Sequence, residues 1–309
     1  TLYGLFSLKP HFNIIIISPH DCQNNNEFII ADEIINNIKI NISLNIPFII
    51  IFTKYDLYQT DENFIEKIDQ VIKSFTLERN LYEFNNEIKD NLLNIPYIYI
   101  SSINGYNYHL LLKLIDFYSE KYNNKNKNTE KFIKERTDTE FVIHDSYIIP
   151  NRGNMVYGIL NSGQININEN YLLGPINEKF YPISIGTIHK KQIDSKNIYP
   201  DESASIEIKL KTELEITKNM YIVKSEKQLD LHNIMTIILL ENNNSFLKVG
   251  SLYTIIFDNI VESIIIDSIN ENKTNVQFLK KQYRPIKYNT ICILKETFNN
   301  NLVIGKIIN

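Results

Sequence analysis

The chain has 309 residues and a formal net charge of −4, which argues against a broadly basic nucleic-acid-binding protein. Its 43% of hydrophobic residues support a buried core, and its length is sufficient for two or three domains. The two cysteines, Cys22 and Cys292, build neither a disulfide framework nor a zinc cluster, which favours a reducing compartment such as the cytoplasm. Because no run of 18 apolar residues is present, we expect no membrane as a partner, and the negative net charge leads us to expect no DNA partner.

Residues 1–122 alternate between strand-like and helix-like patterns. Buried strands are predicted at residues 12–17, 46–52 and 96–100, and amphipathic helices at 27–44, 64–75 and 110–118. An alternation of strands and helices indicates a parallel sheet with helices on both faces. The first region is therefore predicted to be an α/β domain.

The remainder of the chain changes character twice. Residues 123–138 are polar and lack periodicity, so we interpret them as a linker. Two sets of about six short strands follow, separated by glycine and proline turns, with a pause near residues 226–230. This pattern predicts two all-β barrel domains, at 139–228 and 229–309.

Two polar segments come directly after buried strands of the first region. Thr53-Lys54-Tyr55-Asp56 follows the strand at 46–52, and a segment that begins Ser101-Ser102 follows the strand at 96–100. The carboxyl ends of parallel strands form the edge at which α/β folds bind ligands. In this order the two segments resemble the N/T-K-x-D and S-A/S loops with which GTPases read guanine.

That resemblance implies a role for each residue of the two loops. Asp56 accepts hydrogen bonds from the two donors on one edge of guanine, while the alkyl stem of Lys54 lies along the base. The hydroxyl of Thr53 holds its loop by a local hydrogen bond. Ser101 and the backbone N–H groups of Ser102 and Ile103 meet the carbonyl of the base, which excludes adenine because adenine carries a donor there.

Further stretches extend the resemblance along the chain, at 141–150, at 185–191 and at 303–307, with Gly153, Gly158 and Gly163 between the first two. Together they make the chain similar to translational GTPases of the elongation factor Tu class, and most similar to the GTP-binding protein 1 subfamily. The resemblance implies that residues 1–122 are part of a GTP-binding domain with GTP or GDP as ligand. It also implies GTP hydrolysis by the complete protein, with aminoacyl-tRNA, other RNA or the ribosome as partner of the barrels.

The sequence contains no G-x-x-x-x-G-K-S/T segment, whose backbone N–H groups and lysine would cradle phosphates. The D-x-x-G motif next to magnesium in this class is also absent. By resemblance both motifs would precede Thr1, so we expect an N-terminally truncated chain without catalytic or metal-binding residues. Mg²⁺ and GTP hydrolysis are then expected only in the complete protein.

Two other interpretations of the whole chain stay open. It is a non-catalytic RNA-binding or adaptor module if the phosphate-binding half is truly lost, or a metabolic enzyme with two appended barrels. Among single features, His20 follows a strand end but fits a loop histidine better than a catalytic one. The basic run 280–287 is interpreted as a solvated strand edge rather than an RNA contact.

Overall fold

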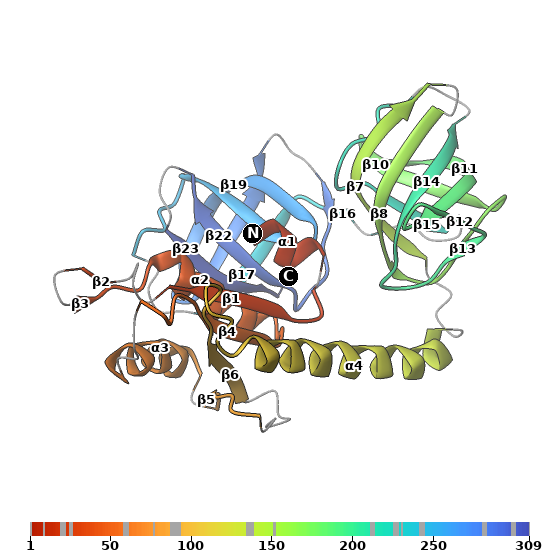
Figure 1. Ribbon diagram of the computed structural model, residues 1–309. Coiled ribbons are helices and arrows are strands. Elements are labelled where there is room, and N and C mark those ends of the chain that lie inside the picture. Colours follow the sequence, from red (N-terminus) through yellow and green to blue (C-terminus); the bar gives the residue numbers. More distant parts are fainter. Residues whose placement is uncertain are drawn as a thin grey trace. The chain divides into compact units, whose positions relative to one another are not determined.

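The computed structural model describes residues 2–8, 10–18, 23–24, 27–57, 62–76, 78–86, 94–133, 139–150, 153–210, 214–224, 229, 231–240, 245–279, 283–297 and 301–308. These residues form two compact units. Figure 1 shows the helices and strands of both units. The first unit consists of Thr1–Leu5 and Lys9–Lys125, and the second of Phe6–Leu8 and Asn126–Asn309. No helix of the described part is long and apolar enough to cross a membrane.

The first unit is built on a four-stranded parallel sheet. Its strands lie in the order β1 (Asn13–Ile17), β4 (Phe48–Phe52), β6 (Asn94–Tyr99) and β5 (Asn80–Glu83). Every residue of β4 is buried, as expected for a central strand with both faces covered. A short helix, α1 (Leu2–Ser7), precedes the sheet, and β2 (Gln23–Asn24) pairs with β3 (Glu27–Phe28) in a small hairpin.

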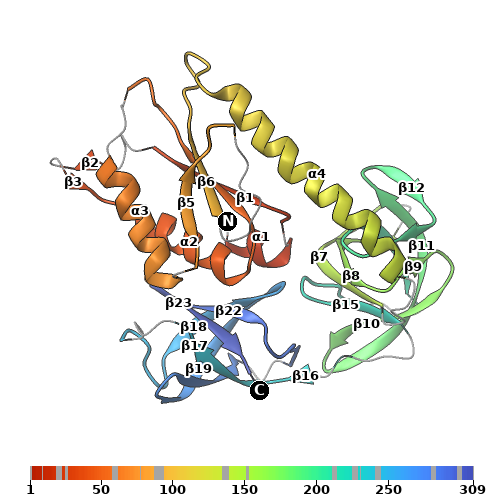
Figure 2. The same cartoon turned by 90° about the horizontal axis from the view of Figure 1, so that it is seen from below.

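Helices cover both faces of this sheet, as the sequence predicted (Figure 2). On one face, α2 (Asp32–Ser43) and α3 (Glu62–Phe75) pack isoleucine and phenylalanine side chains against alternate residues of β1 and β4. On the other face, α4 (Tyr108–Ile133) contributes Leu114 to a cluster with Ile49 and Ile51. Alternate residues of one strand therefore enter two separate cores, which is the side-chain geometry of a buried strand.

The first unit differs from the sequence prediction in several elements: α1, β2 and β3 were not predicted, α2 begins at Asp32 although the helix was expected from residue 27, and two further differences concern β5 and α4. Strand β5 was not predicted, because Asn80–Glu83 is short, carries an exposed residue at each end and lies at the sheet edge. The segment at 123–138, interpreted as an irregular linker, is helical up to Ile133, where α4 ends. Asparagine and lysine lack an apolar period but are compatible with a helix that continues from an already formed one, because propagation costs less than nucleation. Residues 134–138 lie outside the described part.

The second unit contains two closed six-stranded barrels, which confirms the predicted fold class. The first barrel runs in the order β10-β15-β7-β8-β14-β11, and β11 pairs back with β10. Its strands are β7 (Glu140–Ile149), β8 (Gly153–Ser162), β10 (Asn170–Ile176), β11 (Lys179–Lys190), β14 (Ser203–Leu210) and β15 (Tyr221–Lys224). Three shorter strands accompany it: β9 (Ile165–Asn166), β12 (Ile193–Ser195) and β13 (Asn197–Ile198).

The second barrel runs in the order β17-β20-β19-β18-β22-β23, and β23 pairs with β17 to close it. Its strands are β17 (Ile234–Leu239), β18 (Leu252–Phe257), β19 (Ile260–Asn270), β20 (Lys273–Phe278), β22 (Ile291–Glu296) and β23 (Leu302–Ile307). In addition, β16 (Leu231–His232) and β21 (Arg284–Pro285) pair in a separate two-stranded ribbon. In both barrels alternate residues of each strand fill the interior, so each barrel has its own apolar core.

Candidate functional site

The loops predicted to read guanine leave neighbouring strands at the same edge of the sheet. The register places Ile17 beside Phe52, and Phe52 beside Tyr99, so β1, β4 and β6 end side by side. Backbone hydrogen bonds continue past the strand ends, from Ile100 N–H to the Phe52 carbonyl at 2.8 Å and from Tyr55 N–H to the Ile100 carbonyl at 3.2 Å. Main-chain hydrogen bonds alone therefore hold the two loops together.

A hydrogen bond between side chains joins the loops at the predicted site. The hydroxyl of Ser101, which is fully buried, donates to Oδ1 of Asp56 at 2.6 Å. Asp56 itself is exposed, and within the described part its second oxygen, Oδ2, accepts no hydrogen bond. The buried serine thus orients the carboxylate through Oδ1, while Oδ2 stays available to accept hydrogen bonds from a ligand.

Thr53 and Lys54 shape the first loop in ways the sequence did not reveal. The Thr53 hydroxyl lies 3.4 Å from the Ile17 carbonyl, and the Thr53 N–H donates to the same carbonyl at 2.9 Å. The expected local hydrogen bond is thus made to the neighbouring strand, 36 residues away. Lys54 is exposed and has a φ of 60°, in the left-handed region that costs a non-glycine residue about 1 kcal/mol.

The second loop is closed by its own hydrogen bonds. Gly105 N–H donates to the Ser101 carbonyl at 3.0 Å, and a φ of 73° at Gly105 suits a residue without Cβ. The N–H of Ile103 donates to the Ser101 hydroxyl oxygen at 3.3 Å, so this amide supports the serine rather than facing outward. Ser102 is exposed, and in the described part its N–H makes no hydrogen bond. Of the two amides predicted to meet a base carbonyl, Ser102 N–H is the open one.

Two tyrosines that the sequence analysis did not select flank the Asp56–Ser101 pair. The rings of Tyr55 and Tyr106 stack with centroids 4.6 Å apart and an interplanar angle of 13°. Tyr55 also contacts the buried ring of Tyr99 at 5.3 Å. Burial, followed by the nearby Tyr97 and Glu83, raises the pKa of Tyr99 well above its usual value, so the ring stays neutral. In the sequence, each loop carries one aromatic residue, and this was the signal that could have identified the pair.

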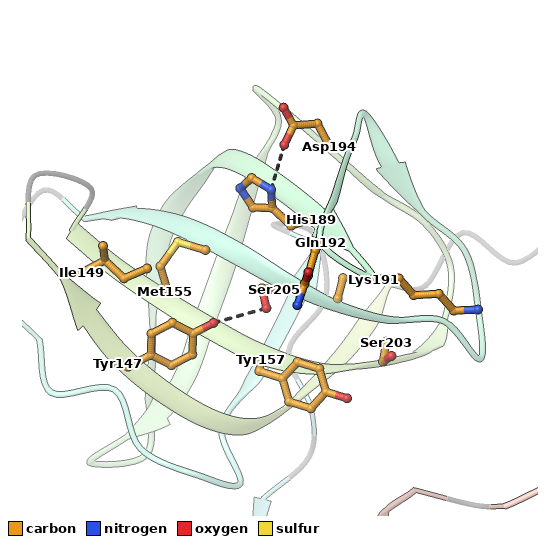
Figure 3. Close-up of a pocket in the computed structure, with 11 residues that line it drawn as sticks. Tyr147, Ile149, Met155, Tyr157, His189, Lys191, Gln192, Asp194, Ser203 and Ser205 are labelled. Atoms are coloured by element: carbon orange, nitrogen blue, oxygen red, sulfur yellow. Dashed lines mark hydrogen bonds and ion pairs between the residues drawn. The ribbon is translucent and has the colours of Figure 1, made fainter.

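A separate pocket of about 690 Å³ lies on the outside of the first barrel (Figure 3). Strands β7, β8, β11, β12 and β14 contribute to it, and its lining residues are Tyr147, Ile149, Met155, Tyr157, His189, Lys191, Gln192, Asp194, Ser203, Ala204 and Ser205. One part is apolar and aromatic, and the Tyr147 hydroxyl donates to Ser205 Oγ at 3.2 Å. The rest carries hydroxyl, amide, imidazole and ammonium groups, so the pocket suits a ligand with a flat apolar part and several polar groups.

A chain of hydrogen bonds holds the histidine at the rim of this pocket. Asp194 Oδ1 lies 2.8 Å from His189 Nδ1, and His189 Nε2 lies 3.2 Å from the Thr187 hydroxyl. Thr187 in turn donates to Glu207 at 3.0 Å. The carboxylate of Glu207 reaches this position because Gly186 has no side chain; a Cβ there would lie 2.6 Å from it. Polar contacts at both ring nitrogens therefore fix the orientation of the His189 ring.

Two cations of the basic run 280–287 are described by the structure, and each lies beside a glutamate. In the basic run, Arg284 donates to Glu262 at 2.9 Å and Lys287 to the buried Glu140 at 2.6 Å, so both cations are paired. Residues 280–282 and His20 lie outside the described part. Within the described residues, no group of three or more histidine, cysteine, aspartate or glutamate side chains can hold a metal ion.

The fold matches a set of solved structures over almost the whole chain. Translation elongation factor SelB from Methanococcus maripaludis, in its apo form, matches 99% of this chain and 68% of its own length, with a TM-score of 0.68 and 12% identity. The GTPase-like domain of Ski7 from S. cerevisiae, bound to GDP and inorganic phosphate, covers 99% of this chain and 75% of its own length, with a TM-score of 0.68 and 14% identity. No family model matches the chain.

With its sheet edge and two barrels, the chain shares the fold of these structures. In sequence it is similar to GTP-binding protein 1 from Xenopus laevis, with 25% identity over 195 residues, 59% of this chain and 28% of that protein. It is also similar to human GTP-binding protein 2, with 20% identity over 284 residues, 87% of this chain and 45% of that protein. The chain thus spans less than half the length of either relative.

Proposed function

We propose that this chain supplies the guanine-recognising part of a GTP-binding protein of the translation-factor type. The observation that carries the proposal is the hydrogen bond from Ser101 to Asp56, which presents a carboxylate at the carboxyl edge of a parallel sheet. A carboxylate in this position accepts the ring N–H and the amino group of guanine together. Similarity to GTP-binding proteins 1 and 2 supports the same ligand.

The other residues of the two loops complete the recognition of the base. The open N–H of Ser102 donates to the guanine carbonyl, and the alkyl stem of Lys54 covers one face of the ring. Ile103 contributes by holding the Ser101 hydroxyl, and Thr53 by joining its loop to β1. Adenine would place a donor against the Ser102 N–H and leave the carboxylate unpaired, so it is rejected strongly.

GTP hydrolysis is proposed for the full-length gene product rather than for these 309 residues. The sequence holds no phosphate-cradling G-x-x-x-x-G-K-S/T segment, and the described residues hold no metal-ligand cluster. Mg²⁺ would be held together with the phosphates and would neutralise their charge. The contribution of this chain is to bind and orient the base, in the cytoplasm where such a factor meets its RNA partners.

The pocket on the first barrel supports a role in binding the acceptor end of an aminoacyl-tRNA, or another RNA 3′ end. Tyr157, Met155 and Ile149 provide a surface on which a base can stack. Ser203 and Gln192 can hydrogen-bond to ribose, and Lys191 can pair with a phosphate. The site is specific to unpaired RNA ends because a duplex cannot place a base in a pocket of this size.

The guanine assignment is tested by Asp56→Asn in the full-length gene product. An amide donates where the carboxylate accepted, so binding of GDP should weaken and binding of XDP, the xanthosine diphosphate, should strengthen. Asp116→Asn is the matched control, because Asp116 is an exposed aspartate of the same unit that lies on α4 and not in either loop. Calorimetric titration with both nucleotides measures the exchange of preference.

An unchanged GDP to XDP preference in Asp56→Asn would remove Asp56 from the site. Absence of guanine binding in the wild-type protein, with RNA binding retained, would instead favour the adaptor interpretation. Binding of GDP and ADP with equal affinity would contradict the proposed role of the Ser102 amide.

A further inference from the structure

The stacked pair Tyr55 and Tyr106 links the same two loops as the Asp56–Ser101 hydrogen bond. Tyr55 immediately precedes Asp56, and Tyr106 lies at the end of the loop that starts at Ser101. The Ser101 N–H donates to the Tyr106 carbonyl at 3.3 Å, so a movement of Tyr106 is passed directly to Ser101. Tyr55 is thus the sequence neighbour of Asp56, and Tyr106 is hydrogen-bonded through its backbone to Ser101, which orients the Asp56 carboxylate.

The stack is anchored on one side and open on the other. The ring of Tyr55 contacts the ring of Tyr99, which is buried in the sheet core. Tyr99 in turn contacts Phe52 at a centroid distance of 5.2 Å. Tyr106 is 42% exposed, and its N–H is held by the Asn104 side chain at 3.0 Å. A ring placed in this way fills no core cavity, so its contact energy goes into holding the second loop against the first.

We infer that Tyr55 and Tyr106 act as a positioning pair that sets selectivity for the amino group of guanine. The inference rests on the proposed guanine site. Two donors of the base reach Asp56 together only if the carboxylate has one fixed direction, and that direction depends on the distance between the loops. Without the stack, only hydrogen bonds hold the loops together, and part of the ordering of Asp56 has to occur at the moment of binding, which weakens the bidentate contact.

Inosine diphosphate separates positioning from a general loss of structure. Its base keeps the ring N–H and the carbonyl but lacks the amino group, so the ratio of its Kd to that of GDP measures the second donor contact alone. A variant that is merely less well folded loses affinity for both nucleotides equally, and the ratio stays constant. A variant that misdirects Asp56 loses affinity mainly for GDP, and the ratio falls.

The experiment compares Tyr106→Ala, Tyr106→Phe and the control Tyr108→Ala in the full-length gene product, with Kd values for GDP and inosine diphosphate. Tyr108 is a suitable control because it is 48% exposed and lies only two residues away. Tyr106→Ala should lower the ratio by about threefold to tenfold, the size of one aromatic pair contact. Tyr106→Phe keeps the stacked ring and should retain the ratio, and Tyr108→Ala should leave it unchanged.

The possible failures are distinguishable. If Asp56→Asn abolishes the discrimination but Tyr106→Ala leaves the ratio at the wild-type value, the positioning role is wrong and the guanine site stands. If Asp56→Asn leaves the ratio unchanged, the proposed site itself is wrong. Should Tyr106→Ala not fold, Tyr106→Leu keeps apolar volume without a flat ring, and a wild-type ratio in that variant overturns the inference.

Discussion

Ser101 Oγ and Asp56 Oδ1 lie 2.6 Å apart although 45 residues separate them in the chain. They meet because β4 and β6 are adjacent parallel strands that end at the same level. The hydroxyl is buried and the carboxylate exposed, so the bond holds the acidic group at the rim without removing it from solvent. A polar group held in one direction by a buried partner is pre-organised for a ligand.

Ser101→Ala should weaken guanine nucleotide binding by the full-length gene product by about tenfold to a hundredfold, since a hydrogen bond to a charged group contributes about 1.5–3 kcal/mol. The fold should persist, because the exposed Asp56 can be hydrated when the hydroxyl is lost. Fluorescence titration with a labelled GDP measures the change. The control is Ser119→Ala, an exposed serine of α4, for which wild-type affinity is expected. Equal affinity in Ser101→Ala would show that the serine does not orient the carboxylate.

Tyr157→Ala should weaken binding of an aminoacyl-tRNA acceptor end by at least about fivefold, because one base stacked on an aromatic ring contributes about 1–3 kcal/mol. The ring belongs to the pocket of the first barrel and is 36% exposed, so its removal leaves the barrel interior intact. Filter binding with a short acceptor-stem RNA measures the effect, with Tyr108→Ala as the control. Identical binding by Tyr157→Ala would place the RNA end elsewhere.

Gly158→Ala should destabilise the first barrel by about 3 kcal/mol, in the range known for overpacked sites. A Cβ at this position would lie 1.9 Å from the Val142 carbonyl oxygen and 2.7 Å from the Phe141 ring, so β7 and β8 would have to separate. Urea unfolding followed by circular dichroism gives the free energy of unfolding. At Gly4, within α1, an added Cβ meets nothing within 4 Å, so Gly4→Ala is the control that should not lower the free energy of unfolding.

Acid should destabilise the first barrel through His144. Burial lowers the pKa of this histidine on β7, so the unfolded chain takes up a proton at a higher pH than the folded chain. Stability from this group is therefore constant above the ordinary pKa of about 6.5 and falls as the pH decreases below it, by at most about 1.4 kcal/mol per pH unit.

The measurement for His144 is urea unfolding at pH 7.5 and 5.5, for the wild type and for His144→Gln. Between these values the wild type should lose more stability than the variant, by at most about 1.4 kcal/mol, because glutamine does not titrate. Parallel losses in the two proteins would show that His144 is protonated as readily in the folded chain as in the unfolded one.

Much of the architecture could be predicted from local patterns. The apolar runs before Thr53 and Ser101 identified two central strands, and alternation after residue 139 identified two barrels, because side-chain periodicity reports burial within one element. Strand β5 escaped prediction because a short edge strand buries few residues. The helical extension to Ile133 escaped because a helix once formed continues through polar residues.

By itself the sequence determined which residues follow the buried strands, and so which carboxylate and which serine could face a ligand at the sheet edge. Only the tertiary structure decided that Ser101 binds Asp56, that Tyr106 stacks on Tyr55, that four strands of the first barrel and the adjoining β12 share a pocket, and that Arg284 and Lys287 are paired with glutamates. The physical reason is the sequence separation of the interacting residues. A burial pattern can be recognised within a few consecutive residues, whereas these contacts depend on strand register and loop closure between segments far apart in the chain.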